Sequence, residues 1–243
     1  MTSSPRIALV TGANKGIGLE IARQLAQAGV FVILGARDPA RAKAAVEDLA
    51  SQGLKAESVA IDLTDAASIA AAAVEIRTTH GRLDILVNNA GIVDPADGPP
   101  SISSVEAVRR IMETNFIGTL AVTQAMLPLL RQSPAGRIVN LSSSLGSLTL
   151  NGDPTSAYYA ARLMGYNASK AALNMLTVQL AEELRGTSIV VNSVSPGYVK
   201  TDLNGHRGVM SVEDGAKLPV EYALLGADAV TGRFVEPGAS TPW

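Results

Sequence analysis

The feature that most limits how this chain can fold is an apolar run followed by a glycine-rich loop and a helical pattern. Arg6 to Val10 has the composition of a buried strand, and Thr11 to Gly18 follows with three glycines. Ile17, Ile21 and Leu25 then recur every four residues, which is helical spacing. Backbone N–H groups at a helix N-terminus, together with the helix dipole, favour an anion such as a pyrophosphate. The spacing is Gly-x-x-x-Gly-x-Gly and not the common dinucleotide fingerprint, so a tight turn without a ligand is the alternative.

Short apolar runs alternate with helical patterns along the rest of the chain. We expect further strands at Val30–Leu34, Val59–Ile61, Leu83–Val87, Arg137–Leu141, Ser188–Val194 and Thr231–Val235. We expect helices at Pro39–Gln52, Asp65–Thr79, Val105–Leu130 and from Tyr166 to Leu184. This order predicts an α/β fold, a Rossmann-like, doubly wound and mainly seven-stranded parallel sheet with helices on both faces. A length of 243 residues suits one such domain spanning residues 1–243.

Composition and charge exclude several classes of function. Hydrophobic residues make up 47% of the chain and charged residues 17%, which suits a large buried core. A net charge of -2 without a basic run argues against nucleic acid or an anionic membrane as partner. The longest apolar stretch, Ile69–Val74, cannot span a bilayer, and Met1–Pro5 lacks a signal-peptide core, so a cytoplasmic location is predicted. His80 and His206 are isolated and the chain has no cysteine, so no metal site is predicted.

A tyrosine and a lysine stand one turn apart at the start of the last long helical pattern. Tyr166 and Lys170 are four residues apart and therefore share a helix face. The ammonium can favour the ionised phenol and lower a pKa that starts at about 10. Such a tyrosine could exchange protons near neutral pH. The same spacing also occurs by chance on solvated helix faces, so the pair needs support from other motifs.

The end of the second expected strand bears on the choice between NAD and NADP. In dinucleotide-binding folds an acid at this point holds the ribose hydroxyls, whereas a basic residue accommodates a 2′-phosphate. Here Ala36 is followed by Arg37, and Lys15 in the glycine loop offers a second cation. The sequence therefore favours NADP, unless Asp38 forms an ion pair with Arg37.

Polar residues follow or interrupt several other predicted elements. Asp62 can face the base of a cofactor or serve as a turn carboxylate. Asn88–Gly91 is a small, amide-rich turn after a strand, and Asn115 is unfavourable inside its helix. Ser142–Ser144 follows the strand that ends at Leu141, where ligands bind in open α/β sheets.

Taken together, the motifs Thr11–Gly18, Asn88–Gly91, Asn115, Ser142–Ser143, Tyr166–Lys170 and Pro196–Gly197 resemble the short-chain dehydrogenase/reductase family. The resemblance runs from about Arg6 to Thr201 and is closest to NADPH-dependent carbonyl reductases. It implies that Tyr166 is the acid/base and Ser143 the hydrogen-bond donor to the substrate oxygen. It further implies that Asn115 anchors a proton-relay water. Lys170 would lower the pKa of the tyrosine and also bind the nicotinamide ribose.

The resemblance also implies a set of cofactor-binding residues. The glycine loop would line the pyrophosphate, Asp62 and Leu63 the adenine, and Asn88 and Ala90 the adenosine-side ribose. Val199 and Thr201 would bind the nicotinamide carboxamide. The full expected set for NADPH is Gly12, Asn14, Lys15, Gly16, Ile17, Gly18, Arg37, Asp62, Leu63, Asn88, Ala90, Gly91, Tyr166, Lys170, Pro196, Gly197, Val199 and Thr201.

The predicted activity is reversible hydride transfer between NADPH and the carbonyl carbon of a small molecule. Three segments are expected to shape the substrate pocket, at about residues 92–104, 144–165 and 197–226. Two alternatives stay open, a reductase of enone double bonds and a catalytically silent NADPH sensor. A homodimer or homotetramer is expected because family members pair the helices that begin at Val105 and Tyr166. A monomer is the alternative, because residues 151–165 could fold over that helix face.

Overall fold

Eight strands form one sheet in the computed structural model, which describes residues 5–243. Their order is β3-β2-β1-β4-β5-β6-β7-β8. The strands are β1 (Ile7–Thr11), β2 (Phe31–Ala36), β3 (Ala56–Ala60), β4 (Ile85–Asn88), β5 (Arg137–Leu141), β6 (Val190–Val194), β7 (Phe234–Glu236) and β8 (Ala239–Ser240). The strands from β3 to β7 in this order are parallel, which confirms the predicted seven-stranded parallel sheet. The two-residue β8 pairs antiparallel with β7 and is too short for a sequence pattern to reveal.

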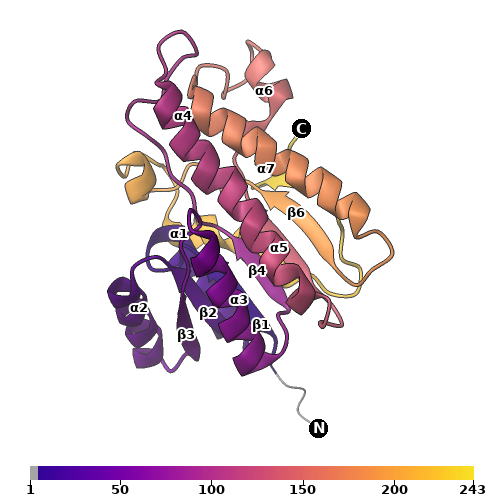
Figure 1. Cartoon of the computed structure of the whole chain (residues 1–243). Helices are drawn as coiled ribbons and strands as arrows, with labels where there is room; N and C mark the ends of the chain where they lie inside the picture. Colours follow the sequence, from indigo (N-terminus) through magenta and orange to yellow (C-terminus); the bar gives the residue numbers. More distant parts are fainter. Residues whose placement is uncertain (1–4) are drawn as a thin grey trace.

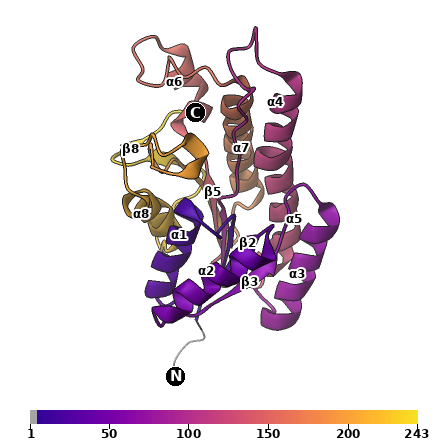
Figure 2. The same ribbon diagram turned by 90° about the vertical axis from the view of Figure 1, so that its left-hand side faces the viewer.

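Helices cover both faces of the sheet (Figure 1). Seen edge-on, α1, α2 and α8 lie on one side, and α3, α4, α5 and α7 lie on the other (Figure 2). Their bounds are α1 (Gly16–Gln27), α2 (Pro39–Ser51), α3 (Ala66–His80), α4 (Val105–Met112), α5 (Thr119–Leu130), α6 (Leu148–Gly152), α7 (Met164–Glu183) and α8 (Val212–Ala223). In residues 5–243, no helix is both long and apolar enough to cross a membrane.

Successive side chains of the central strands point to opposite faces of the sheet and belong to two separate hydrophobic cores. In β1, Ile7 and Leu9 belong to the core that packs under α3, α5 and α7. Ala8 and Val10 belong to the core under α1, α2 and α8. Because both faces of a parallel sheet are covered, its strands read as continuous apolar runs. Full burial of one such aliphatic side chain contributes about 1.5–3 kcal/mol, and this burial holds the strand ends in place.

The predicted helix from Val105 to Leu130 is interrupted at its centre. A π-helical segment, Glu113–Gly118, separates α4 from α5 and contains the fully buried Asn115. π-turns are rare and occur frequently at functional sites. The unfavourable asparagine was the sequence signal for this irregularity.

Two helices were not predicted. α8 contains Gly215 and Pro219, both of which weaken a helical pattern. The glycine is required by close packing, because a β-carbon at Gly215 would lie 2.4 Å from Val199 Cγ2. The five-residue α6 is too short to show helical periodicity, and Ser147 caps it through Leu150 N.

Candidate active site and cofactor cleft

A cleft of about 780 Å³ opens at the carboxyl ends of the central strands. It lies between the β1–α1 loop, the segments that follow β2, β3 and β4, and residues 200–206 after β6. The strand order reverses between β1 and β4, and ligands of doubly wound sheets bind beside such a switch point. The fold therefore gathers at one edge the loops that the sequence singled out.

The glycine loop forms the floor of this cleft. Gly16 adopts φ +58°, which favours glycine, and a β-carbon there would meet only Thr201 Cγ2 at 3.8 Å. At Gly18 a β-carbon would lie 2.4 Å from Asn89 Nδ2, so this glycine permits close packing. Asn89 in turn donates to the carbonyls of Thr11 (2.7 Å) and Gly12 (3.2 Å). The sequence reasoning missed Asn89, which ties the loop to the end of β4.

The N-terminus of α1 points an uncapped positive dipole end at the cleft. Lys15 occupies the N-cap position without a side-chain capping bond, and the first turn contains no acidic residue. The first N–H groups of a helix have no intrahelical acceptors. This end of α1 can therefore bind a pyrophosphate, as the glycine loop predicted.

Two arginines line the cleft beyond the end of β2. Arg37 faces it as predicted, and Arg41 from the first turn of α2 joins it. Asp38 caps α2 through Ala40 N and Arg41 N, and its carboxylate lies 3.3 Å from Arg41 Nε. Asp38 therefore pairs with Arg41 and not with Arg37, which was the alternative considered from the sequence. Arg37 remains the principal candidate for contact with a 2′-phosphate.

Lys15 is placed differently from the expectation. Its ammonium lies 2.6 Å from Asp202 Oδ2, and His206 Nε2 lies 2.9 Å from the other oxygen of Asp202. The hydrogen bond from Lys15 lowers the pKa of the Asp202 carboxyl. This ion pair links the glycine loop to the segment after β6 across the cleft, so Lys15 is already partnered by a carboxylate.

Most of the other predicted cofactor residues line the cleft, but Asn88 does not. Its side-chain amide donates to Thr123 Oγ1 (3.0 Å) and Asn140 Oδ1 (2.8 Å) and is buried beneath the site. An asparagine that follows β4 does line the cleft, but it is Asn89 and not the predicted Asn88. The predicted residues along the cleft are Gly12, Asn14, Lys15, Gly16, Ile17, Gly18, Arg37, Asp62, Leu63, Ala90, Gly91 and Thr201.

Asp62 combines the two roles weighed for it. Its Oδ1 accepts hydrogen bonds from Thr64 N (2.9 Å) and Thr64 Oγ1 (2.8 Å), and the first of these lowers the pKa of the Asp62 carboxyl. Its side chain also lines the cleft next to Leu63. The cap of α3 is Asp65, which accepts from Ala67 N.

After β6, the chain folds tightly against Met210. Gly197 has φ +86°, and a β-carbon there would lie 2.5 Å from Met210 Sδ. Val199 is buried and its carbonyl accepts from Asn204 Nδ2 (2.8 Å). Of the predicted residues Pro196, Gly197, Val199 and Thr201, only Thr201 borders the cleft; the other three shape the turn that carries it.

Three consecutive serines follow β5, and their environments differ. Ser142 Oγ donates to Asn174 Oδ1 (2.6 Å), and Ser144 Oγ donates to Glu236 Oε2 (2.6 Å). Both of these serines are buried. Ser143 is half-buried and its Oγ accepts from Leu145 N (3.2 Å), so its hydroxyl hydrogen is directed neither to a buried amide nor to a carboxylate. The geometry thus singles out the serine that the family pattern implied.

Tyr166 and Lys170 lie on the first turns of α7, but the lysine does not lower the pKa of the tyrosine. Burial raises the pKa of the Tyr166 hydroxyl to about 12, and a hydrogen bond with Ser143 opposes this only in part. Lys170 Nζ donates to the Leu141 carbonyl (2.7 Å) and lies 5.6 Å from the centre of the tyrosine ring. Burial lowers the pKa of this ammonium to about 8. The predicted lowering of the tyrosine pKa is therefore wrong for this structure, because burial of the phenolate outweighs the nearby cation.

Asn115 joins the catalytic helix to the cleft. Its Oδ1 accepts from Ile92 N (2.8 Å), and its Nδ2 donates to Ile92 O (3.0 Å) and Ser169 Oγ (3.1 Å). A β-carbon at Gly91 would lie 3.4 Å from Asn115 Oδ1 and 3.7 Å from Lys170 Nζ. Both N–H groups of the Asn115 amide and one acceptor site of its oxygen are therefore used within the protein.

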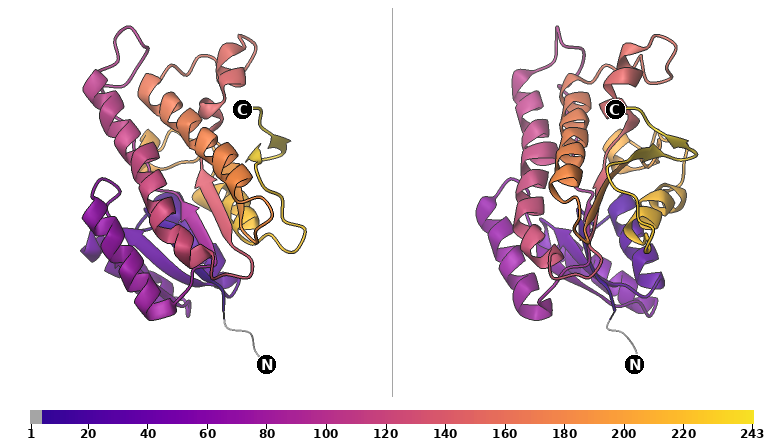
Figure 3. Two further views of the ribbon diagram at one scale, coloured as in Figure 1. Left: turned by 45° about the vertical axis from the view of Figure 1, so that its right-hand side comes forward. Right: turned by 90° about the vertical axis from the view of Figure 1, so that its right-hand side faces the viewer.

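The segment between Ser143 and Tyr166 packs at the N-terminal end of α7. Figure 3 shows α6 at this end of the molecule, close to the C-terminus, and Thr149 Oγ1 donates to the carbonyl of Trp243 (2.8 Å). Tyr158 donates to Glu236 Oε2 (2.6 Å), the oxygen that also accepts from Ser144. Burial raises the pKa of the Tyr158 hydroxyl, and the carboxylate raises it further. The segment is thus anchored to the end of the sheet.

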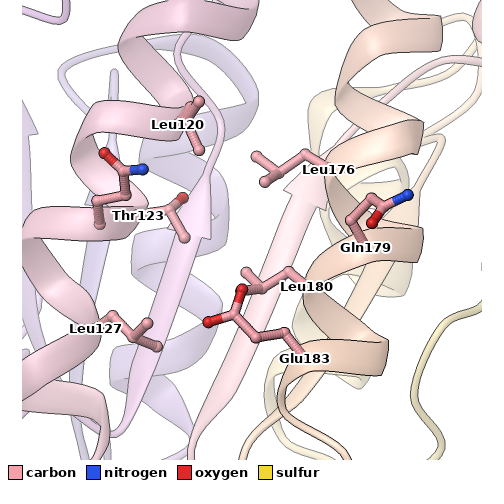
Figure 4. Close-up of a pocket in the computed structure, with 8 residues that line it drawn as sticks. Leu120, Thr123, Leu127, Leu176, Gln179, Leu180 and Glu183 are labelled. Carbon is pink, nitrogen blue, oxygen red and sulfur yellow. The ribbon is translucent and has the colours of Figure 1, made fainter.

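A smaller pocket lies between the outer faces of α5 and α7 (Figure 4). Four leucines line it, with Thr123 and three longer polar side chains beside them. None of its lining residues comes from residues 144–165. Residues 144–165 therefore do not form part of this groove.

The comparisons with known proteins agree with the fold. A model of the short chain dehydrogenase family matches residues 6–210. The chain belongs to this family. It is 36% identical to pig carbonyl reductase [NADPH] 1, over 100% of this chain and 96% of the relative. It is 34% identical to (-)-isopiperitenone reductase of Mentha piperita, over 96% of this chain and 97% of the relative.

Solved structures show the same likeness. The NADPH-bound carbonyl reductase from chicken fatty liver has a TM-score of 0.85 at 30% identity, covering 98% of this chain and 99% of that one. Salutaridine reductase from Papaver somniferum has a TM-score of 0.82 at 32% identity, covering 94% and 99%. The predicted family, fold and kinship with carbonyl reductases are confirmed.

Proposed function

We propose that this chain transfers hydride reversibly between NADPH and a carbonyl carbon, with Ser143 binding the oxygen and Tyr166 supplying the proton. The observation that carries the proposal is the contrast among Ser142, Ser143 and Ser144. Only the middle hydroxyl is half-exposed and hydrogen-bonded to Tyr166, whereas Ser142 and Ser144 donate to a buried amide and to a carboxylate.

The pKa values suit proton donation to a developing alkoxide. With a pKa of about 12, the Tyr166 hydroxyl stays protonated at neutral pH and can donate a hydrogen bond. Ser143 offers a second donor where negative charge develops, which stabilises the transition state. Lys170, with a pKa of about 8, can exchange protons near neutral pH. Through a water molecule it can return a proton to the Tyr166 oxygen after the tyrosine has donated its own. In this scheme Asn115 holds that water by its backbone carbonyl.

The residues of the cleft fit NADPH. When bound, this cofactor supplies the hydride. The uncapped end of α1 would hold its pyrophosphate, and Arg37, with Arg41 next to it, would hold the 2′-phosphate. Asp62 and Leu63 would border the adenine. Two relatives that are named for their use of NADPH support this assignment.

The segments at residues 92–104, 144–165 and 197–226 are proposed to shape the substrate pocket. Each carries large apolar side chains with high exposure, namely Ile102 at 78%, Leu148 at 76% and Val209 at 77%. Apolar surface of this kind favours an apolar ligand over a polyol. The name of one relative, (-)-isopiperitenone reductase, refers to a ketone, which is consistent with such a ligand. We therefore propose an apolar cyclic ketone as the substrate class.

A substrate panel tests the activity. NADPH oxidation is followed with apolar cyclic ketones, aromatic aldehydes, diketones, enones and keto-sugars, and products are identified by chromatography. Formation of a secondary alcohol from the cyclic ketones supports the proposal. Saturated ketones as the only products from enones indicate a double-bond reductase, and absence of any turnover with retained NADPH binding indicates a silent sensor.

Self-association through the groove between α5 and α7 is the second part of the proposal. The groove has four leucines in its lining, α7 also exposes Met175 and Val178, and no residue of 144–165 lines the groove. Exposed apolar patches on long helices commonly mark protein interfaces. A homodimer across this face is expected. The cytoplasmic location stays a prediction.

A further inference from the structure

Asp97 lies between β4 and α4 and contacts the first turn of α7. Its Oδ1 accepts hydrogen bonds from Gly98 N (2.9 Å), Ser103 Oγ (2.9 Å) and Gly165 N (2.8 Å). Its Oδ2 accepts from Tyr166 N (2.9 Å), and the Gly98 carbonyl accepts from Met164 N (2.9 Å). Three consecutive N–H groups of α7 are therefore bonded by a segment more than sixty positions earlier in the chain.

This arrangement replaces a cap that α7 lacks. The residue at its N-cap position is Leu163, which makes no capping hydrogen bond. The first N–H groups of a helix have no partners within the helix, and Asp is among the residues that normally supply them from the N-cap itself. Here a carboxylate from another segment does so, and its negative charge is favoured at the positive end of the helix dipole.

The start of α7 is also held by close packing. Gly165 is buried, and a β-carbon there would lie 3.0 Å from Ile111 Cδ1, 3.1 Å from Val108 Cα and 3.3 Å from Asp97 Oδ2. The next residue is Tyr166, whose own N–H is one of the bonded groups. The backbone that carries the phenol is therefore fixed by α4 on one side and by Asp97 on the other.

We propose that Asp97 is a positioning residue that sets the distance between the Tyr166 hydroxyl and Ser143. It touches neither substrate nor cofactor and acts through the backbone of the tyrosine. The inference rests on the proposed role of Tyr166 as proton donor. Asp97 also links Tyr166 to the predicted substrate segment 92–104, because Ser103, near the end of that segment, donates a hydrogen bond to the same carboxylate.

A carboxylate that caps another helix provides a matched control. The Oδ1 of Asp65 accepts a hydrogen bond from Ala67 N (2.9 Å) and so caps α3. Asp65 lies outside the three segments proposed to shape the substrate pocket, and it makes no bond to α7. Asp65→Asn therefore alters a capping carboxylate without removing the cap of α7.

The test compares Asp97→Asn, Asp97→Ala and Asp65→Asn with the parent, each saturated with NADPH and the best ketone found. Asparagine keeps the size of aspartate but has one acceptor oxygen, so either Gly165 N–H or Tyr166 N–H faces an amide NH₂. We expect kcat to fall about ten- to a hundredfold in Asp97→Asn, and further in Asp97→Ala, because small displacements of a reacting group are costly. Hydrogen exchange at Gly165 and Tyr166 should accelerate, while the Kd for NADPH should change by less than about twofold. Asp65→Asn should keep kcat within about twofold.

A double variant separates positioning from general loss of structure. If Asp97 acts through the tyrosine hydroxyl, Asp97→Asn added to Tyr166→Phe lowers the residual rate no further. A parent-like kcat in Asp97→Asn, or an equal loss of rate in the Tyr166→Phe background, would overturn the inference while leaving the proposed function intact. A parent-like kcat in Tyr166→Phe alone would overturn both.

Discussion

Burial acts on Tyr166 and Lys170 in opposite directions, because it disfavours the charged form of each. It raises the pKa of the tyrosine to about 12 and lowers the pKa of the lysine to about 8. The tyrosine is thereby kept as a proton donor, and the lysine is brought close to neutral pH. In the proposed mechanism, Tyr166 is therefore the acid, and Lys170 is a group that can return a proton to it.

The lysine makes stability depend on pH. Between pH 8 and about 10, Lys170 is protonated in the unfolded chain but largely neutral in the folded one, so the free energy of unfolding rises with pH. The rise should be roughly 2 to 3 kcal/mol. Above about pH 10, Tyr166 acts oppositely, because the unfolded chain loses that proton first.

Urea unfolding of the free protein across this pH window measures the effect. Lys170→Met removes it, so the difference in stability between parent and variant should shift in favour of the parent as pH rises from 8 to 10. A difference that stays constant across the window would show that Lys170 does not titrate there.

Arg37 should decide the preference for NADPH. Hydrogen bonds to charged groups contribute about 1.5–3 kcal/mol, so Arg37→Ala should weaken NADPH roughly ten- to a hundredfold and leave NADH nearly unchanged. Arg41→Ala should have the smaller effect, because Asp38 already pairs with that arginine. Ala36→Asp should repel the phosphate and offer NADH a ribose acceptor.

Steady-state kinetics with both cofactors provide the measurement. The ratio of kcat/KM for NADPH to that for NADH should fall in Arg37→Ala and fall further in Ala36→Asp. A parent that already prefers NADH, or a ratio unmoved by Arg37→Ala, would show that the cofactor preference is set elsewhere.

At the scale of elements, an irregular helix carries the connection between the cleft and α7. The π-helical segment from Glu113 to Gly118 turns Asn115 inward, where it bonds Ile92 and Ser169. Asn115 therefore joins the segment after β4 to α7.

Removing this side chain should destabilise the fold. Asn115→Ala removes the partner of the Ile92 N–H and C=O groups and one of the two bonds of Ser169 Oγ, which still donates to Tyr166 O. A buried group left without a partner costs about 1–3 kcal/mol. We expect a loss of at least about 2 kcal/mol in urea unfolding. Glu113→Ala, at an exposed position of the same segment, is the control and should stay within about 0.5 kcal/mol of the parent. Equal stability of the two variants would contradict this role of Asn115.

Sequence patterns predicted most of these elements because strong periodicity and buried strands leave clear signals. They missed α8, where Gly215 and Pro219 are tolerated only because the helix packs directly on Val199. They assigned Asn88 to the cleft instead of Asn89, because adjacent residues in a turn cannot be told apart without the backbone path. They also gave the wrong sign for the pKa of Tyr166, because spacing reveals a neighbouring charge but not the extent of burial.

At the scale of the whole molecule, the sheet brings distant segments to one edge. The loop after β1, the ends of β2 and β4 and the segment after β6 enclose the cleft, and Ser143 follows the neighbouring strand β5. The ion pair between Lys15 and Asp202 joins residues 187 positions apart. Ligand binding and catalysis therefore depend on the complete domain.

The open groove between α5 and α7 predicts the oligomeric state. Light scattering should give a dimer for the parent and a monomer for Leu176→Glu, which places a charge inside the groove. Val74→Glu, on the exposed surface of α3, is the control and should leave the dimer intact. A parent that is monomeric at working concentration would reject the interface.

The central claim is that the Tyr166 hydroxyl protonates the reduced carbonyl, and the most direct test is the rate of the chemical step in Tyr166→Phe. Single-turnover oxidation of bound NADPH by a saturating ketone should slow about a hundred- to ten-thousandfold, because general acid catalysis is lost. Binding of NADPH, followed by cofactor fluorescence, should change little, because the ring is retained. A variant that oxidises NADPH at the parent rate would contradict the account.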